Sequence, residues 1–155
     1  MLIALVLLAL LAPATDIVAV DDVIDAPRAL FGRARAAVER ALGPAPTVRP
    51  RVLAGAPGVA PEPVDELIYP GVVVDVSRRT TTVRRVEISA PRFTLPRGLG
   101  VGVARARVEA VLGEAQLVSD ASVLYLDADG FPNTVEFHFR DDRVQRIEWS
   151  FAPAD

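Results

Sequence analysis

The chain has 155 residues, 51% of them hydrophobic and 24% charged, so it can bury the core of one compact domain or two very small ones. Its formal net charge is −3 and all 17 basic residues are arginine, so it lacks the positive field expected of a nucleic-acid-binding protein. The absence of cysteine excludes disulfides, cysteine nucleophiles, cysteine metal ligands and lipidation on cysteine.

The chain begins with an unbroken apolar run from Leu2 to Leu11, followed by Ala12-Pro13-Ala14. An apolar segment before a small-x-small site is typical of a signal peptide, although no arginine precedes this run. The run is shorter than the roughly 20 apolar residues that span a bilayer. We therefore expect residues 1–14 to be a signal peptide that contacts the membrane only transiently. An uncleaved anchor and a buried first element are the alternatives.

Residues 15–90 are expected to form a first helix-and-strand unit. Asp16 to Asp25 interleaves acidic residues with Val and Ile, which indicates a short strand or an irregular lead-in. Pro27 suits the first turn of a helix, and Gly43 is a natural stop. The apolar stripe of that helix consists of Phe31, Ala34, Val38, Ala41 and Leu42.

The rest of this unit divides into a loop and two strands. Residues 44–63 are rich in proline and glycine and predict an exposed loop. Leu67 to Val76 and Val83 to Ser89 predict strands, with the turn between them at residues 78–81.

Residues 91–155 are expected to form a second unit. After a proline-containing connection, a helix is predicted from Ala104 to Leu112, ended by Gly113. Asp129-Gly130 and Asp141-Asp142 predict the turns that separate three strands. Those strands are Val123 to Leu126, Thr134 to Arg140 and Val144 to Phe151.

The two units resemble each other. Seven residues recur at a constant offset of 70, beginning with Gly32 and Gly102 and ending with Ala45 and Ala115. The segment 83–89 similarly parallels 144–150. The pattern predicts an α+β fold of two repeated units, each a helix plus an antiparallel meander, with the helices packed on one face of the sheet.

The segment from Gly102 to Ala115 resembles the helix of the SmpA/OmlA and β-lactamase-inhibitor-protein-like (BLIP-like) group, in which a glycine-led helix ends in Leu-Gly. Leu124-Tyr125-Leu126 and residues 135–139 resemble the meander strands of that group, and residues 141–144 its last turn. The resemblance implies an exported envelope or secreted protein that binds other proteins. It transfers no contact to a particular residue, and this chain lacks the acylated cysteine of the lipoprotein members.

Side chains alternate across a strand, which divides the predicted sheet into two faces. The core is expected to contain Val38, Leu42, Val108, Leu112, Phe137, Phe139, Ile147 and Trp149. The opposite face should carry charges of both signs. We take these as candidate binding residues: Arg85, Glu87, Glu136, His138, Arg140, Arg146 and Glu148.

His138 is the only histidine, and no nucleophile elbow accompanies it, so we expect no catalytic residue, metal or cofactor. The function predicted is that of a non-catalytic exported protein, periplasmic or secreted, that binds a protein partner through its sheet. The alternative is a small ligand-binding protein or enzyme that uses the polar cluster around His138, for which a concave pocket at that cluster would be required.

Overall fold

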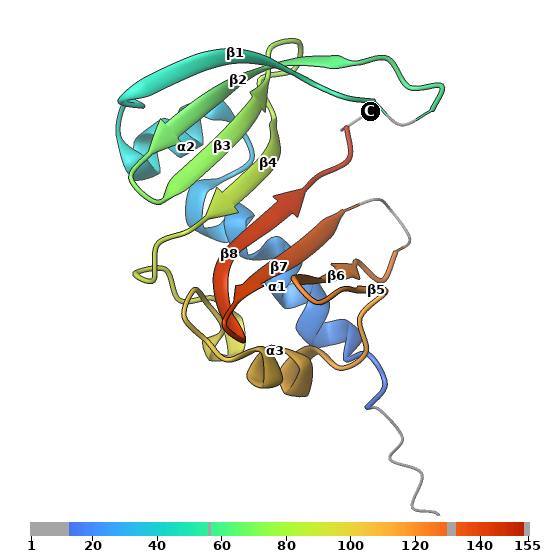
Figure 1. Ribbon diagram of the computed structural model, residues 1–155. Helices are drawn as coiled ribbons and strands as arrows, with labels where there is room; N and C mark the ends of the chain where they lie inside the picture. The colour runs from blue at the N-terminus through green and yellow to red at the C-terminus, as the bar shows by residue number, and fades with distance from the viewer. Residues whose placement is uncertain (1–12, 56, 130–132, 154–155) are drawn as a thin grey trace, which may run out of the picture.

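The computed structural model describes residues 13–55, 57–129 and 133–153. It is an α+β fold with three α-helices and an eight-stranded antiparallel sheet. The strand order is β1-β2-β3-β4-β8-β7-β6-β5 (Figure 1). The last strands of the two halves of the chain, β4 and β8, therefore pair at the centre of the sheet, and the first strands, β1 and β5, form its two edges. The predicted segment from Leu2 to Leu11 and the residue Gly130 lie outside the described residues.

The first half of the chain contributes two helices and four strands. These are α1 (Ile17–Phe31), α2 (Arg35–Leu42), β1 (Thr47–Leu53), β2 (Glu62–Tyr69), β3 (Val72–Ser77) and β4 (Val83–Ile88). The second half follows a short 3-10 helix, η1 (Pro96–Gly98). It comprises α3 (Arg105–Leu112), β5 (Leu117–Val118), β6 (Ser122–Leu126), β7 (Thr134–Arg140) and β8 (Arg143–Ser150).

Helix α1 overturns the expectation of a strand or lead-in at residues 16–25. The Asp16 carboxylate caps the helix by accepting a hydrogen bond from the Ala19 amide at 3.0 Å. Val20, Val23 and Ile24 then reach the core at helical spacing. A short stretch of alternating apolar and acidic residues is compatible with both the helical and the strand period. Here the helix forms because it buries its apolar residues in the core.

The expected helix starting at Pro27 is also wrong. Pro27 lies inside α1, which ends at Phe31 with Gly32 as its C-cap, and α2 begins only at Arg35. Gly32 has a φ of 81°, and a Cβ there would overlap the Cβ of Ala37. This close approach requires glycine and separates the two helices.

Strand assignments in the first half need two further corrections. The segment 44–63 is not simply a loop, because β1 lies within it as an edge strand. An edge tolerates Pro50, whose missing N–H would interrupt the ladder of a central strand. The predicted strand from Leu67 to Val76 is two strands, because the chain turns at Pro70-Gly71.

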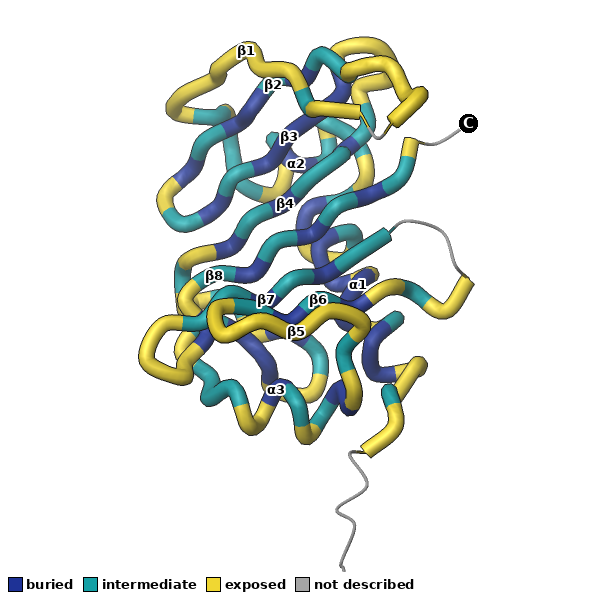
Figure 2. The backbone as a smooth tube through the Cα atoms, turned by 45° about the vertical axis from the view of Figure 1, so that its right-hand side comes forward, coloured by how far each residue is buried: buried dark blue, intermediate teal, exposed yellow. Residues whose placement is uncertain are grey.

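The two faces of the sheet differ in character, as Figure 2 shows through the alternation of burial along the strands. We call one the apolar face; Leu67, Val74, Val86, Trp149 and Val135 share a row of paired residues on it, and all are buried. The Trp149 indole nitrogen donates to the Val23 carbonyl of α1 at 2.9 Å. The expected core is confirmed for six of its eight residues, whereas Leu42 and Phe139 are only partly buried against it.

Candidate functional site: a charged band across the sheet

The face opposite the apolar face carries a continuous set of ion pairs, centred on Arg85 of β4. Its Nη2 atom lies 2.7 Å from Glu87 Oε2 and 2.9 Å from Glu148 Oε2 of the neighbouring strand β8. The pairing of Glu87 with Glu148 in the β4–β8 register places both carboxylates beside this one guanidinium. Without the arginine, two like charges would oppose each other across the strands.

The set continues through β8 into β7. Arg146 Nη1 lies 3.2 Å from Glu87 Oε2, and Arg146 Nη2 lies 3.4 Å from His138 Nδ1. His138 Nε2 is 3.5 Å from Glu136 Oε2, within ion-pair distance, although it makes no hydrogen bond with a described residue. The His138 ring therefore lies between Arg146 of the neighbouring strand β8 and Glu136 of its own strand.

In the other direction the set crosses β3, β2 and β1. Asp75 Oδ2 lies 3.6 Å from Arg85 Nη1 and equally far from Arg51 Nη1. Arg51 also pairs with Glu66 at 3.1 Å, and Arg49 pairs with the same carboxylate at 2.7 Å. We name the whole set the charged band. It comprises Arg49, Arg51, Glu66, Asp75, Arg85, Glu87, Glu148, Arg146, His138 and Glu136.

Asp75 is the most deeply placed charge of the band. Its side chain is 0% exposed, and neither carboxylate oxygen has a hydrogen-bond partner among the described residues. Burial raises the pKa of Asp75 above its ordinary value, and the opposing effect of Arg85 and Arg51 does not cancel that rise. The ionised carboxylate therefore costs folding free energy at neutral pH.

For the neighbouring side chains of Arg85 and Glu148, in contrast, the pKa shifts favour the ionised form. Burial alone would lower the pKa of Arg85, but the hydrogen bond to Glu148 and the nearby carboxylates raise it overall. Burial would likewise raise the pKa of Glu148, but hydrogen bonding and attraction from Arg85 lower it overall. The pair Arg85–Glu148 thus favours its ionised form, while the carboxylate of Asp75 does not.

Six of the seven candidate residues lie together in the charged band. The exception is Arg140, which is exposed at the end of β7 and forms no ion pair with any residue that the structure describes. Four residues of the band are not among the candidates predicted from the sequence: Arg49, Arg51, Glu66 and Asp75. Two of them lie on β1, in a segment whose proline and glycine content predicts a loop. Val64 and Leu67 are both buried but lie three residues apart, on opposite faces of β2, so no simple alternation in the sequence marks Glu66.

None of the cavities found among the described residues is lined by the cluster of Glu136, His138 and Glu148; other residues line them. Among residues 13–55, 57–129 and 133–153, no three His, Asp or Glu side chains converge on a position that could hold a metal ion. No helix in these ranges is long and apolar enough to cross a membrane.

Comparisons with known proteins add little to this geometry. No family profile matches the sequence, and no curated protein matches it. One solved structure that is similar is the uncharacterized protein yfeY from Escherichia coli. It has 13% sequence identity and a TM-score of 0.44, with 84% of this chain and 94% of that chain covered.

Proposed function

We propose that this chain is a non-catalytic exported protein that binds another envelope or secreted protein through the charged band. The observation that carries the proposal is the continuity of the band across six adjacent strands. Charged side chains fixed by neighbours lose little conformational freedom on binding, and complementary charges orient a partner. An apolar flank adjoins the band, because Glu136 pairs in register with Leu124, and Leu124 with Leu117.

We further propose that the protein is a duplicated BLIP-like unit with all three helices on the apolar face. The two halves contain matching contacts that support the duplication. The Tyr69 hydroxyl donates to the Gly43 carbonyl after α2, and the Tyr125 hydroxyl donates to the Gly113 carbonyl after α3, both at 3.0 Å. Buried residues of each helix belong to the same hydrophobic cluster as the apolar face, which supports the placement of the helices.

Export rests on the apolar run from Leu2 to Leu11. Cleavage after Ala14 would remove the hydrogen bond from the Glu114 amide to the Pro13 carbonyl. It would keep the bond from the Asp16 amide to the Leu112 carbonyl, and the Asp16 cap of α1. N-terminal sequencing of protein recovered from cells should therefore begin near Thr15, and an intact Met1 on protein from the cytosol would contradict export.

Partner binding is tested by comparing two exposed arginines. Arg146 belongs to the band, while Arg40 lies on α2 and is exposed to solvent. Purified Arg146→Gln and Arg40→Gln should both fold, as circular dichroism would show. In pull-downs from the cell envelope, Arg146→Gln should recover the partner with about tenfold lower affinity, equivalent to about 1.4 kcal/mol. Equal recovery by the two folded variants would rule out this part of the band as the docking site.

A further inference from the structure

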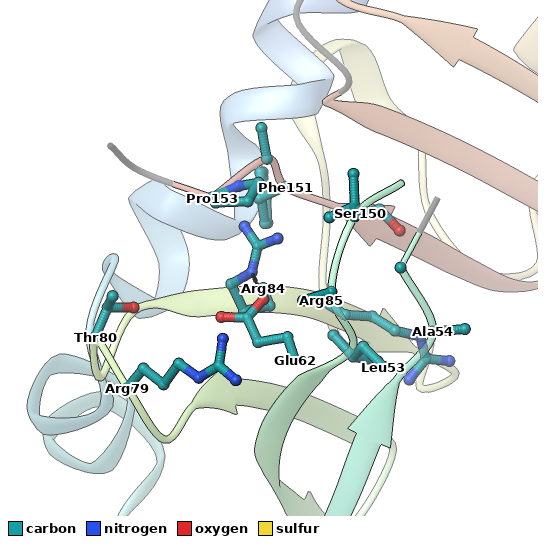
Figure 3. A pocket seen from close by; sticks show the side chains of 14 residues that line it. Leu53, Ala54, Glu62, Arg79, Thr80, Arg84, Arg85, Ser150, Phe151 and Pro153 are labelled. Carbon is teal, nitrogen blue, oxygen red and sulfur yellow. Dashed lines mark hydrogen bonds and ion pairs between the residues drawn. The ribbon is translucent and has the colours of Figure 1, made fainter. Parts of the chain in front are cut away.

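A separate cavity of about 750 Å³ lies at the end of the sheet away from His138. Its walls come from the loop between β1 and β2, the ends of β4 and β8, and residues 151–153 (Figure 3). The loop folds tightly at this point. A Cβ on Gly55 would overlap the carbonyl of Val59, so only glycine allows the two sides of the loop to approach.

Arg84 enters this cavity because of a β-bulge. Asp75 pairs with Arg85 and Val76 with Val83, so Arg84 is the extra residue on β4 that has no counterpart on β3. Bulges re-aim a side chain relative to the regular alternation of a strand. Figure 3 shows the Arg84 guanidinium rising from the strand toward Phe151 and Pro153.

The guanidinium of Arg84 is buried but only partly bonded. Its side chain is 10% exposed, and its Nε atom donates to Glu62 Oε2 at 2.6 Å. The Nη1 atom is buried and has no hydrogen-bond partner among the described residues. A buried arginine nitrogen without an acceptor is costly, and a bound anion would supply the missing acceptor.

The surroundings of Arg84 restrict the kind of anion. Leu53, Val59, Phe151 and Pro153 make most of the lining apolar. The Glu62 carboxylate already pairs with Arg84, and hydrogen bonding to Ser77 and Arg84 lowers its pKa although burial opposes this. A ligand therefore meets an arginine and a fixed negative charge together, which disfavours dianions such as phosphate esters. A planar carboxylate matches the fork of a guanidinium.

We propose that this cavity binds a small monocarboxylate with an apolar body. The carboxylate accepts hydrogen bonds from the terminal nitrogens of Arg84, and the apolar body lies against Leu53, Val59 and Phe151. Arg79, which lines the cavity beside Glu62, attracts the anion toward the opening. Arg85 of the charged band also lines this cavity, but the proposed ligand is held by Arg84, which is not part of the band, so the two proposals are tested separately.

Octanoate and octan-1-ol, titrated calorimetrically into the whole chain, test the proposal. The two probes share an apolar tail and differ in the carboxylate. Octanoate should bind at one site, and octan-1-ol about tenfold more weakly. Arg84→Gln should reduce octanoate affinity about tenfold while leaving the weak binding of octanol unchanged. No octanoate binding by the native chain, or equal binding of the two probes, would overturn the proposal.

A second pair of variants covers the case in which Arg84→Gln fails to fold. Ala60 is exposed on the loop and lines the cavity, so a longer side chain there leaves the core undisturbed. Ala60→Glu and Ala60→Gln have the same shape and differ by one negative charge. Ala60→Glu should bind octanoate several-fold more weakly than Ala60→Gln. Equal affinity of both variants for octanoate would show that charge at this cavity does not govern binding and would contradict the site.

Discussion

Asp75 and His138 occupy corresponding places in the two halves of the sheet. Each pairs in register with an arginine of the last strand in its half, Arg85 or Arg146, and each immediately precedes a β-bulge. Asp75 is nevertheless completely buried, whereas the side chain of His138 is 20% exposed. The strand pairing is therefore alike at the two positions, while the surroundings of the two side chains differ.

The edge strands account for this difference. Strand β1 has seven residues and brings Arg51 within 3.6 Å of Asp75. Strand β5 has two residues, Leu117 and Val118, and both are exposed. A long edge strand thus covers the band in the first half, and a short one leaves it accessible in the second. We therefore expect the proposed partner to contact the band in the second half.

The largest expected effect is a difference in stability between variants of the two corresponding arginines, Arg85 and Arg146. Arg85→Gln would leave the buried Asp75 and the carboxylate of Glu148 without their main countercharge, which should cost about 3–5 kcal/mol of unfolding free energy. Arg146→Gln removes a side chain that is 40% exposed, and should cost at most about 1 kcal/mol. Denaturant unfolding of both variants measures the difference, and equal losses would show that the halves are not electrostatically distinct.

A second comparison concerns the last leucine of two helices. Leu112 ends α3 and is 0% exposed, while Leu42 ends α2 and is only partly buried. Leu112→Ala should lower the unfolding free energy by about 2–5 kcal/mol because it leaves a cavity in the core. Leu42→Ala should cost clearly less. An unchanged thermal midpoint for Leu112→Ala would mean that the buried stripe of α3 is assigned wrongly.

This pair also shows what could be predicted from sequence. The helical spacing of Val108 and Leu112 and the glycine at 113 specify α3 almost completely, since local pattern and burial agree there. The sequence likewise predicts strands β6, β7 and β8, because an alternating pattern is bounded by turn residues there. Local pattern failed for α1 and β1. Whether Val20 and Val23 form a helix depends on packing beneath Trp149, and β1 is a strand because β2 lies beside it.

Part of the candidate site could likewise be predicted from the sequence, and part of it could not. Alternation alone placed six of its residues on one face, since strand periodicity does not depend on tertiary context. The depth of Asp75 could not be foreseen, because it depends on Arg51 from an edge strand distant in sequence. The cavity at Arg84 depends on a bulge, which one sequence does not reveal.

The pH dependence of stability distinguishes Asp75 from Glu148. The pKa of Asp75 is raised in the folded state, so its ionisation destabilises the fold at neutral pH; this penalty shrinks as the pH falls through the raised folded-state pKa and is absent below the ordinary value of 3.8. Asp75→Asn should therefore be more stable than the native chain at pH 7. That advantage should vanish by about pH 3.8, as urea unfolding at several pH values would show.

Glu148 has the opposite sign. Its pKa is lowered in the folded state, so its contribution is present above its ordinary value of 4.5 and is lost as the pH falls through the folded-state pKa. Glu148→Gln should be less stable than the native chain at pH 7 by about 1–2 kcal/mol, and the deficit should shrink below pH 4.5. Parallel pH profiles for Asp75→Asn and Glu148→Gln would refute this electrostatic distinction.

The smallest effect concerns the two tyrosines that bond to the ends of α2 and α3. Tyr69→Phe and Tyr125→Phe each remove one hydrogen bond to a glycine carbonyl, and each should cost about 1 kcal/mol. Burial raises the pKa of Tyr125 to about 12, which agrees with its deeper position. Tyr125→Phe should accordingly be the more destabilising of the two. A negligible effect of both substitutions on the thermal midpoint would contradict a stabilising role for these two hydrogen bonds.

Site-specific photocrosslinking in cells tests the docking surface most directly. Leu124 and Ile68 hold corresponding places beside the band, since Leu124 pairs with Glu136 and Ile68 with Val73, one strand outward in each half. Ala110, exposed on α3, serves as the control. A photoreactive residue at Leu124 should capture a defined envelope protein, with less capture at Ile68 and none at Ala110. Capture at Ala110 but not at Leu124 would contradict docking through the sheet.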